Sequence, residues 1–391
     1  MHNLALFSQV ALLILLAPIF ARTLRLPVAV VEIILGTFLA WFGLVDVDDD
    51  IFRNIAEIGF FYLMFLAGLE IEIKKFLNLK ESFFTRASIY FVSLYGISVL
   101  AYFIFDLSLV YIVAIPTVSL GMIMALINDH GRDQKWLDMA LLVGAFGELV
   151  SIAFLVMFDV TINHGIGFEF YRSIGILLLI LAVSYYLFKA LNMVLWWFPE
   201  LRKIIMPEKD NMSQDIRVSM AFFFVFIAIM QYLGIDMVLG SFIAGVFLGN
   251  LFSHKIELPH TLNTIGFGFL IPLFFIYIGS TLDLNTLFTQ EILYKSFFIV
   301  TLMVLARIIS TLIAYGKFWS IKESFVFAIS SSMPLTLLIA IATIAMKNNI
   351  IDINEYYSFI FAAVLEALLF MVLINFVMKK YEFPLKKKPQ E

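Results

Sequence analysis

The amino-acid sequence predicts an all-helical protein that crosses a membrane about thirteen times. Three observations lead to this prediction, and the first two concern composition: the 391-residue chain is 62% hydrophobic, and only 14% of its residues are charged. A soluble domain is roughly 45–50% apolar and about 25% charged, so this chain has too few polar groups to cover a water-facing surface. The third observation is a succession of apolar runs, each long enough to span a bilayer as a helix.

The apolar runs give the predicted spans in order. A helix needs about 17 to 25 mostly apolar residues to cross the hydrocarbon core. The connections at Asp106–Leu107 and Gly234–Ile235 are short enough for tight helical hairpins, so counts of twelve or fourteen spans stay open. The predicted spans are 4–20, 26–44, 52–70, 85–105, 108–128, 136–158, 170–192, 217–234, 236–252, 262–281, 292–316, 322–346 and 355–378.

The positions of lysine and arginine support this count and orient the chain. Cytoplasmic loops carry an excess of both residues. Of the 26 in the chain, Lys189 and Arg307 lie inside spans, and all but four of the others fall on one side, together with the C-terminal tail. We therefore expect a multi-pass inner-membrane protein with its N-terminus outside and its C-terminus in the cytoplasm. The four on the other side are Arg53, Arg172, Lys295 and Lys347.

The composition also argues against several kinds of site and partner. The chain has no cysteine, and its five histidines fall in or beside loops. Thiol chemistry, a buried histidine metal centre and a serine–histidine hydrolase are therefore not expected. The longest loop, residues 197–214, is expected to be a cytoplasmic hinge between two halves. The tail is short, so we expect the lipid bilayer as partner, no nucleic acid and no soluble regulatory domain.

Two prolines predict broken helices at matching places. Pro116 lies in the middle of the fifth span and Pro334 in the middle of the twelfth, and proline removes a backbone donor and breaks or kinks a helix. Each is followed 32 residues later by a glutamate in the next span, Glu148 or Glu366. The two units run in opposite directions, which predicts an inverted-topology repeat of spans four to six and eleven to thirteen. Paired broken helices are typical of a transporter's binding site.

Glu148 is the strongest candidate for the functional centre. It lies roughly 18 Å along its span at 1.5 Å per residue, and a carboxylate at that depth requires a reason. Gly144 and Gly147 clear space beside it for another backbone or a hydrated ion. A proton or a monovalent cation can neutralise this side chain, so the two would compete. The alternative is a permanently protonated glutamate that bonds between helices.

Arg307 must have a carboxylate or several carbonyls near it, because guanidinium keeps its charge at the bilayer centre. The candidates are Glu148 and Glu366, of which Glu366 is preferred as the partner carboxylate, although it can also be a second proton site. Arg307 is expected either to clamp the two broken helices or to take part in gating. Glu32, Gly147 and Ser151 are further candidates beside the site.

Several segments resemble the bacterial monovalent cation:proton antiporters of the Kef-type branch. They occur in the right order along most of the chain, and together they are specific. They are Ile55–Glu70, Val31–Gly36, Leu239–Gly245 and Ile271–Gly279.

The resemblance implies a homodimer of thirteen-helix chains with two crossing, unwound helices. A panel domain, here about residues 1–50 and 170–281, would hold the dimer, and a six-helix core, about 52–158 and 292–378, would slide past it like an elevator. The family's ion-binding carboxylate falls on Glu148 and its conserved basic residue on Arg307. Its polar crossover segment falls on Thr117, Val118 and Ser119.

This sequence departs from the family at two positions. The family usually has a polar residue before an aspartate, where this chain has Gly147 and Glu148, and a threonine–serine pair where this chain has Val118 and Ser119. The sequence predicts exchange of Na⁺ or K⁺ for protons at Glu148, with Thr117 and Ser119 as further ligands, no cofactor and no enzymatic activity. One carboxylate beside a non-titrating Arg307 predicts electroneutral exchange. An organic ion as substrate and a non-transporting membrane sensor are the alternatives.

Overall fold

The structure is a computed structural model that describes most of the chain. Ser119, the second half of the fifth predicted span, most of the seventh, residues 198–212 of the longest loop and the tail after residue 380 lie outside the described residues. The described residues are 2–24, 26–44, 49–69, 81–118, 135–164, 213–233, 237–252, 257–332 and 334–380, with residues 175, 186, 189, 190, 193 and 197.

Regular structure in the described residues is helical throughout, as the sequence predicts. Six helical segments there are long and apolar enough to cross a membrane, and a bent pair of helices makes a seventh. The number thirteen stays a prediction. The six segments are Asp50–Leu69, Phe83–Phe105, Gln214–Tyr232, Glu257–Ser280, Gln290–Tyr315 and Ile353–Phe370, and the bent pair is Ile321–Ser330 with Leu335–Lys347.

The chain divides into two compact units. Unit 1 comprises Met1–Phe20, Val31–Asn78 and Val160–Leu282, and unit 2 comprises Ala21–Val30, Leu79–Asp159 and Asp283–Glu391. Helix α3 (Asp50–Leu69) therefore groups with unit 1, whereas the sequence analysis assigned residues 52–158 to the core. The reason lies in packing, because α3 buries its side chains against other helices of unit 1.

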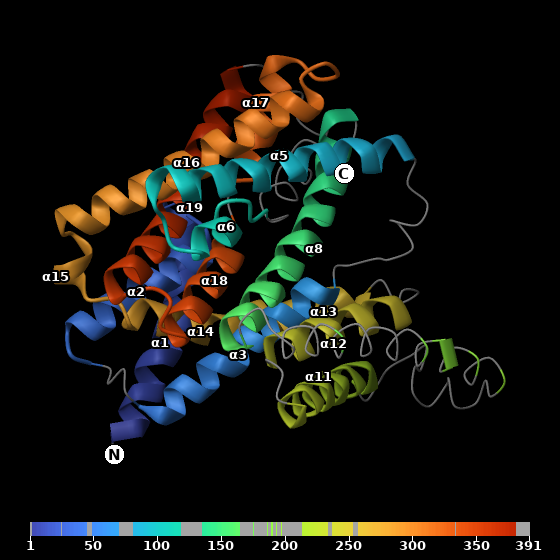
Figure 1. Ribbon diagram of the computed structural model, residues 1–391. Coiled ribbons are helices and arrows are strands. Elements are labelled where there is room, and N and C mark those ends of the chain that lie inside the picture. The colour runs from blue at the N-terminus through green and yellow to red at the C-terminus, as the bar shows by residue number, and fades with distance from the viewer. Residues whose placement is uncertain are drawn as a thin grey trace, which may run out of the picture. The chain divides into compact units, whose positions relative to one another are not determined.

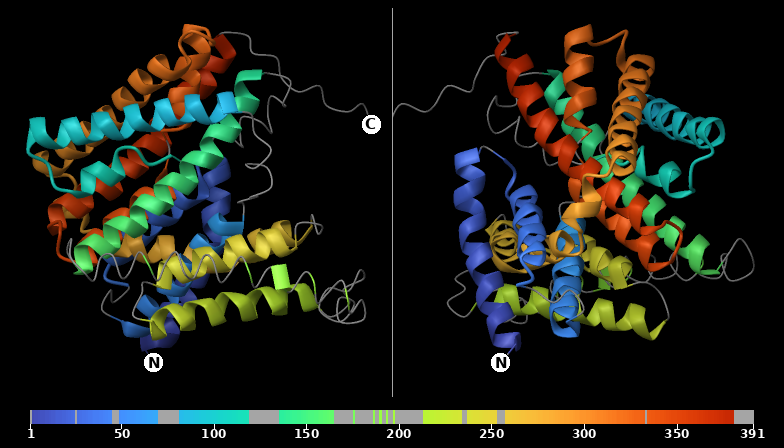
Figure 2. Two further views of the ribbon diagram at one scale, coloured as in Figure 1. Left: turned by 45° about the vertical axis from the view of Figure 1, so that its right-hand side comes forward. Right: turned by 90° about the vertical axis from the view of Figure 1, so that its left-hand side faces the viewer.

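In unit 1, α3 is the central helix and packs most extensively on α12 and α14 (Figures 1 and 2). Helix α12 also packs on α11. Small and aromatic residues of α3, including Phe60, Phe61 and Phe65, are buried there. The other helices of the unit are most of α1 (His2–Leu24) and of α2 (Val28–Trp41), whose facing ends belong to unit 2, and α11 (Gln214–Tyr232), α12 (Met237–Leu251), α13 (Glu257–Ile265), the π-helical turn η1 (Gly266–Leu270) and α14 (Ile271–Ser280).

Four glycines allow the helices of unit 1 to touch through their backbones. A Cβ on Gly36 of α2 would lie 2.1 Å from the carbonyl oxygen of Ile276 on α14, closer than any side chain can approach. The contacts are reciprocal: α2 and α14 each place a glycine against the backbone of the other, and so do α3 and α12. The other three pairs are Gly279 with Ile33, Gly68 with Phe242 and Gly245 with Phe65, at 2.0 to 2.1 Å.

Unit 2 holds both broken helices. Helix α16 packs on α5, α17 and α19, and α18 packs on α19 and α6 (Figures 1 and 2). The helices of the unit are α5 (Glu81–Phe105), α6 (Val110–Ala114), α8 (Lys135–His164), α15 (Leu284–Leu287), α16 (Gln290–Tyr315), α17 (Ile321–Ser330), α18 (Leu335–Lys347) and α19 (Ile353–Lys380).

Candidate functional site

The first helix break follows α6, which ends at Ala114, two residues before Pro116. Proline has no amide hydrogen, so the carbonyl of Ile112, four residues earlier, loses its helical donor. The Ser98 hydroxyl of α5 reaches this carbonyl at 3.4 Å and donates to the carbonyl of Tyr111 at 3.1 Å. The Thr117 hydroxyl donates to the carbonyl of Val113 at 2.8 Å. Hydroxyls therefore replace the missing backbone donors, as membrane helices require.

The second break lies between α17 and α18, which meet at a bend of 46°. Helix α17 ends at Ser330, and Pro334 immediately precedes α18. The last carbonyls of a helix lack intrahelical partners, and here serine hydroxyls supply the donors. Ser331 and Ser332 both donate to the carbonyl of Ala328, at 3.1 and 2.8 Å, and Ser330 donates to that of Phe327.

Arg307 of α16 connects the two breaks. Its side chain is fully buried, and its guanidinium donates three hydrogen bonds to main-chain carbonyls. Nε donates to Ser331 at 3.2 Å, at the second break, and Nη1 donates to Met303 at 2.9 Å. Nη2 donates to Thr117, at the first break. Arg307 thus bonds to the main chain at both breaks, and its role as a clamp or in gating stays a prediction.

Helix α8 reaches the first break on both sides of Glu148. The Ser151 hydroxyl accepts a hydrogen bond from the amide of Val118 at 3.1 Å, and this amide is one that the break leaves without a helical partner. A Cβ on Gly147 would lie 2.8 Å from the ring of Phe91 and 3.0 Å from Cβ of Val118. Glycine at 147 therefore lets α8 approach the break closely. The close packing needs a glycine at 147, the position where the family resemblance implies a polar residue.

Glu148 itself lies in the middle of α8 and is 8% exposed. It stands between Gly147 and Ser151 in sequence, so the contacts of these two residues hold this part of α8 beside Thr117 and Val118. The buried Thr117 carbonyl and hydroxyl, the Glu148 carboxyl and the Ser331 carbonyl are oxygen groups of the kind that bind hard cations. Unit 2 thus brings together the residues that carry most of the predicted site.

Glu366 lies near the middle of α19, is 1% exposed and has no hydrogen-bond partner on either carboxyl oxygen among the described residues. Arg307 acts on it electrostatically, yet the two side chains form no hydrogen bond in the described structure. The pairing of Arg307 with Glu366 therefore stays a prediction. Glu32 is 3% exposed on α2 and belongs to unit 1, whereas the other site residues that are described belong to unit 2.

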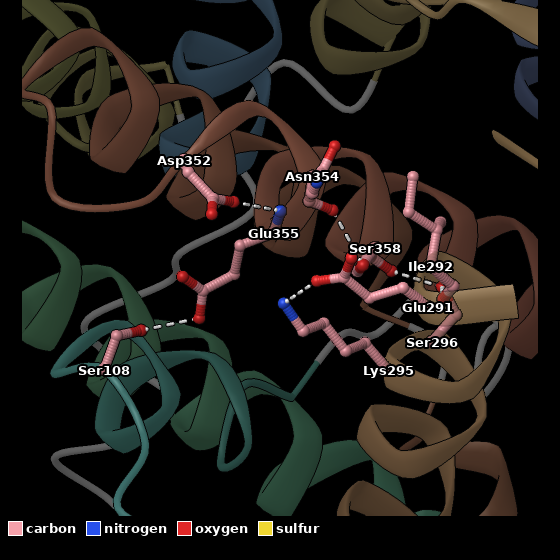
Figure 3. Close-up of polar contacts among 9 residues, drawn as sticks. All are labelled: Ser108, Glu291, Ile292, Lys295, Ser296, Asp352, Asn354, Glu355 and Ser358. Atoms are coloured by element: carbon pink, nitrogen blue, oxygen red, sulfur yellow. Dashed lines mark hydrogen bonds and ion pairs between the residues drawn. The ribbon is translucent and has the colours of Figure 1, made fainter. Parts of the chain in front are cut away.

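A second polar cluster, absent from the sequence predictions, surrounds the start of α19 (Figure 3). The Ser108 hydroxyl, just before α6, donates to the Glu355 carboxylate at 2.9 Å, and Asp352 caps the helix by accepting from the Glu355 amide at 2.7 Å. On α16, Lys295 and Glu291 form an ion pair at 2.8 Å. The cluster ties the segment before α6 to α19, and sequence could not show it because its members lie far apart in the chain.

The described residues contain no cluster of side chains that could bind a divalent metal ion. Among the residues that the structure describes, no three histidine, aspartate or glutamate side chains gather around one point. A set of neutral oxygens with one carboxyl suits a monovalent cation better than a divalent one, because ligand charge sets the preference.

A family model now connects this arrangement with known proteins. The model of the sodium/hydrogen exchanger transmembrane region matches residues 11–380. The chain belongs to the sodium/hydrogen exchanger family. The resemblance to monovalent cation:proton antiporters is thereby confirmed, and this is a family of membrane-spanning transporters rather than enzymes.

Individual relatives of the chain also carry the names of Na⁺/H⁺ antiporters. The chain is 29% identical over 420 residues to the protein named putative Na⁺/H⁺ antiporter YjbQ of Bacillus subtilis, with 99% of this chain covered, and it spans 66% of that protein's length. It is 24% identical to a Na⁺/H⁺ antiporter of Enterococcus hirae, with 92% of this chain and 94% of that protein covered. The fold resembles that of the sodium proton antiporter MjNhaP1 of Methanocaldococcus jannaschii, with a TM-score of 0.68, 14% identity and coverage of 98% and 99% of the two chains.

Proposed function

We propose that the protein exchanges a monovalent cation, Na⁺ or K⁺, for protons across the bacterial inner membrane. The observation that carries this proposal is the pair of helix breaks joined by the buried Arg307, with Glu148 held beside the first break. Broken helices at matching positions expose carbonyls that bind ions. Membership of the exchanger family and the names of the relatives support the same activity.

In the proposed cycle, Glu148 binds either a proton or the cation. The Thr117 hydroxyl, Ser119 and carbonyls at the breaks would complete the cation shell, because a dehydrated cation needs several oxygens. Arg307 keeps its charge throughout, so one carboxyl exchanges one cation for one proton and no net charge moves. No cofactor takes part, since the transported ions are the only ligands that the chemistry requires.

Alternation between the two sides would follow the scheme that the family resemblance suggests. Two chains would form a homodimer of about thirteen spans each, with the N-terminus outside and the C-terminus in the cytoplasm. A core containing the broken helices would move past a panel and expose Glu148 to each side in turn, in the manner of an elevator.

Reconstitution with a panel of ions tests the function. Proteoliposomes would be loaded with a pH-sensitive dye and challenged with Na⁺, K⁺, Li⁺ and an organic cation at several pH values. We expect proton movement with Na⁺ or K⁺, at a rate that an imposed membrane potential does not change. Proton movement with the organic cation alone would favour the alternative substrate, and no movement with any ion would favour a membrane sensor.

A further inference from the structure

Glu366 is a buried acid that the exchange mechanism at Glu148 does not use. It lies 1% exposed in the middle of α19, and neither of its carboxyl oxygens has a hydrogen-bond partner among the described residues. An ionised carboxylate without a partner is strongly disfavoured in such a place, whereas the protonated, neutral form is tolerated. The structure therefore fits a Glu366 that carries a proton.

Arg307 is the natural partner of an ionised Glu366, but its hydrogen bonds go elsewhere. Its three nitrogens all donate to main-chain carbonyls, those of Met303, Ser331 and Thr117. Guanidinium and carboxyl are near enough to act on each other electrostatically. Two of the five N–H groups of the guanidinium remain available. The Glu366 carboxyl is therefore a second acceptor to which the Arg307 guanidinium can donate.

The protonation state of Glu366 decides which partner Arg307 prefers. A guanidinium bonded to a carboxylate forms a shorter and stronger pair than one bonded to neutral carbonyls. Loss of the Glu366 proton to water would draw Arg307 toward α19 and release the carbonyls of Thr117 and Ser331. One O–H bond is broken, the proton passes to water and one ion pair is formed, so the net charge of the Arg307–Glu366 pair falls from +1 to zero.

We propose that Glu366 is a proton-operated switch that determines whether the carbonyls of the two breaks are held by Arg307 or are free to bind the cation. The proposal rests on the proposed function, because the released carbonyls belong to the same cation site. At acidic pH the protonated switch would lock the transporter in the arrangement seen here. In the working range Glu366 would stay ionised through the cycle, so the exchange stays one for one.

Other charged groups near α19 do not take this part. The helices that pack closely on α19 are α15, α16, α17 and α18, and Arg307 is the charged residue on them that lies in a helix interior and acts on Glu366. The remaining charges on these helices lie at or near their ends. They are Asp283 before α15, Glu291 and Lys295 on α16, Lys322 and Glu323 on α17, and Lys347 on α18.

The number of protons displaced by the cation tests the switch. Cation affinity of the purified protein would be measured across pH by calorimetry with Na⁺ and K⁺, for wild type, Glu366→Gln and Glu366→Asp. Linkage makes affinity fall by about tenfold per pH unit for each group that must lose a proton. With both Glu148 and Glu366 to deprotonate, wild type should approach a hundredfold per unit at acidic pH. Glu366→Asp should keep this steepness, whereas Glu366→Gln should bind weakly at all pH values and never exceed tenfold per unit.

Two results would overturn the switch: a wild-type slope that stays at or below tenfold per unit, or a Glu366→Gln protein with wild-type affinity and slope. Thermal unfolding of each variant in detergent identifies a protein that has failed to fold, and Glu366→Asp then decides the question by its slope. A failure of the proposed function would look different. The wild-type protein would then bind no cation, or Glu148→Gln would leave the cation affinity and its pH slope unchanged.

Discussion

Arg307 donates a hydrogen bond to the carbonyl of Thr117, a residue 190 positions earlier in the chain. The same guanidinium bonds to Ser331, so one buried side chain holds the ends of both broken helices. Because a guanidinium offers five donors in a fixed fork, it can serve the Thr117 and Ser331 carbonyls at the two breaks together with the Met303 carbonyl of its own helix. This arrangement makes Arg307 the structural centre of unit 2.

Removal of Arg307 should therefore destabilise the protein strongly. Arg307→Ala removes the guanidinium donor from the Thr117 and Ser331 carbonyls at the two breaks, at about 1–3 kcal/mol for each unsatisfied group. Arg307→Lys should recover part of this loss, because an ammonium can reach some of the carbonyls but lacks the planar fork. Thermal unfolding in detergent measures both. Arg217→Ala, on an exposed position of α11, is the control, and an equal effect of the two alanine variants would contradict the clamp.

Gly147 should not tolerate a larger side chain. Alanine there would place its Cβ 2.8 Å from Phe91 and 3.0 Å from Val118, which pushes α8 away from the first break. We expect a loss of stability of about 1–3 kcal/mol from overpacking and a marked fall in the exchange rate, since Glu148 moves with α8. Gly96→Ala on α5 is the matched control, because nothing lies within 4 Å of its Cβ, and alanine there should be neutral or slightly stabilising. Normal exchange by Gly147→Ala would contradict this account of the site.

The reciprocal glycines of unit 1 should behave as pairs. Gly68→Ala and Gly245→Ala each place a Cβ within about 2 Å of a carbonyl oxygen on the facing helix, at Phe242 and Phe65, so each should force α3 and α12 apart. We expect both variants to lose stability to a similar extent, which unfolding in detergent would measure. Gly268→Ala, with open space around its Cβ, serves as control. A large loss in only one of the pair would show that the two contacts are not equivalent.

The sequence predicted the parts of the site that depend on local chemistry. Proline predicts where a helix breaks, and the structure has breaks beside Pro116 and Pro334. Apolar runs give depth, and Glu148, Arg307 and Glu366 are buried as their depth suggested.

Contacts between distant segments could not be predicted in this way. The sequence left a carboxylate and several carbonyls open as partners of Arg307, and only the structure shows that its hydrogen bonds go to main-chain carbonyls. The hydroxyl of Ser98 that replaces the donor missing at Pro116 comes from a different helix. The glycine contacts of unit 1 become meaningful only once the helices are paired. Each depends on packing between residues far apart in the chain.

The most direct test of the central claim is exchange by Glu148→Gln in proteoliposomes. Glutamine keeps the size and hydrogen-bonding capacity of the side chain but cannot take up or release a proton, so cation-dependent proton movement should be abolished. Glu291→Gln, which changes an exposed glutamate paired with Lys295, should retain the wild-type rate. Wild-type exchange by Glu148→Gln, in protein that unfolds at the normal temperature, would contradict the assignment of Glu148 as the exchanging carboxyl.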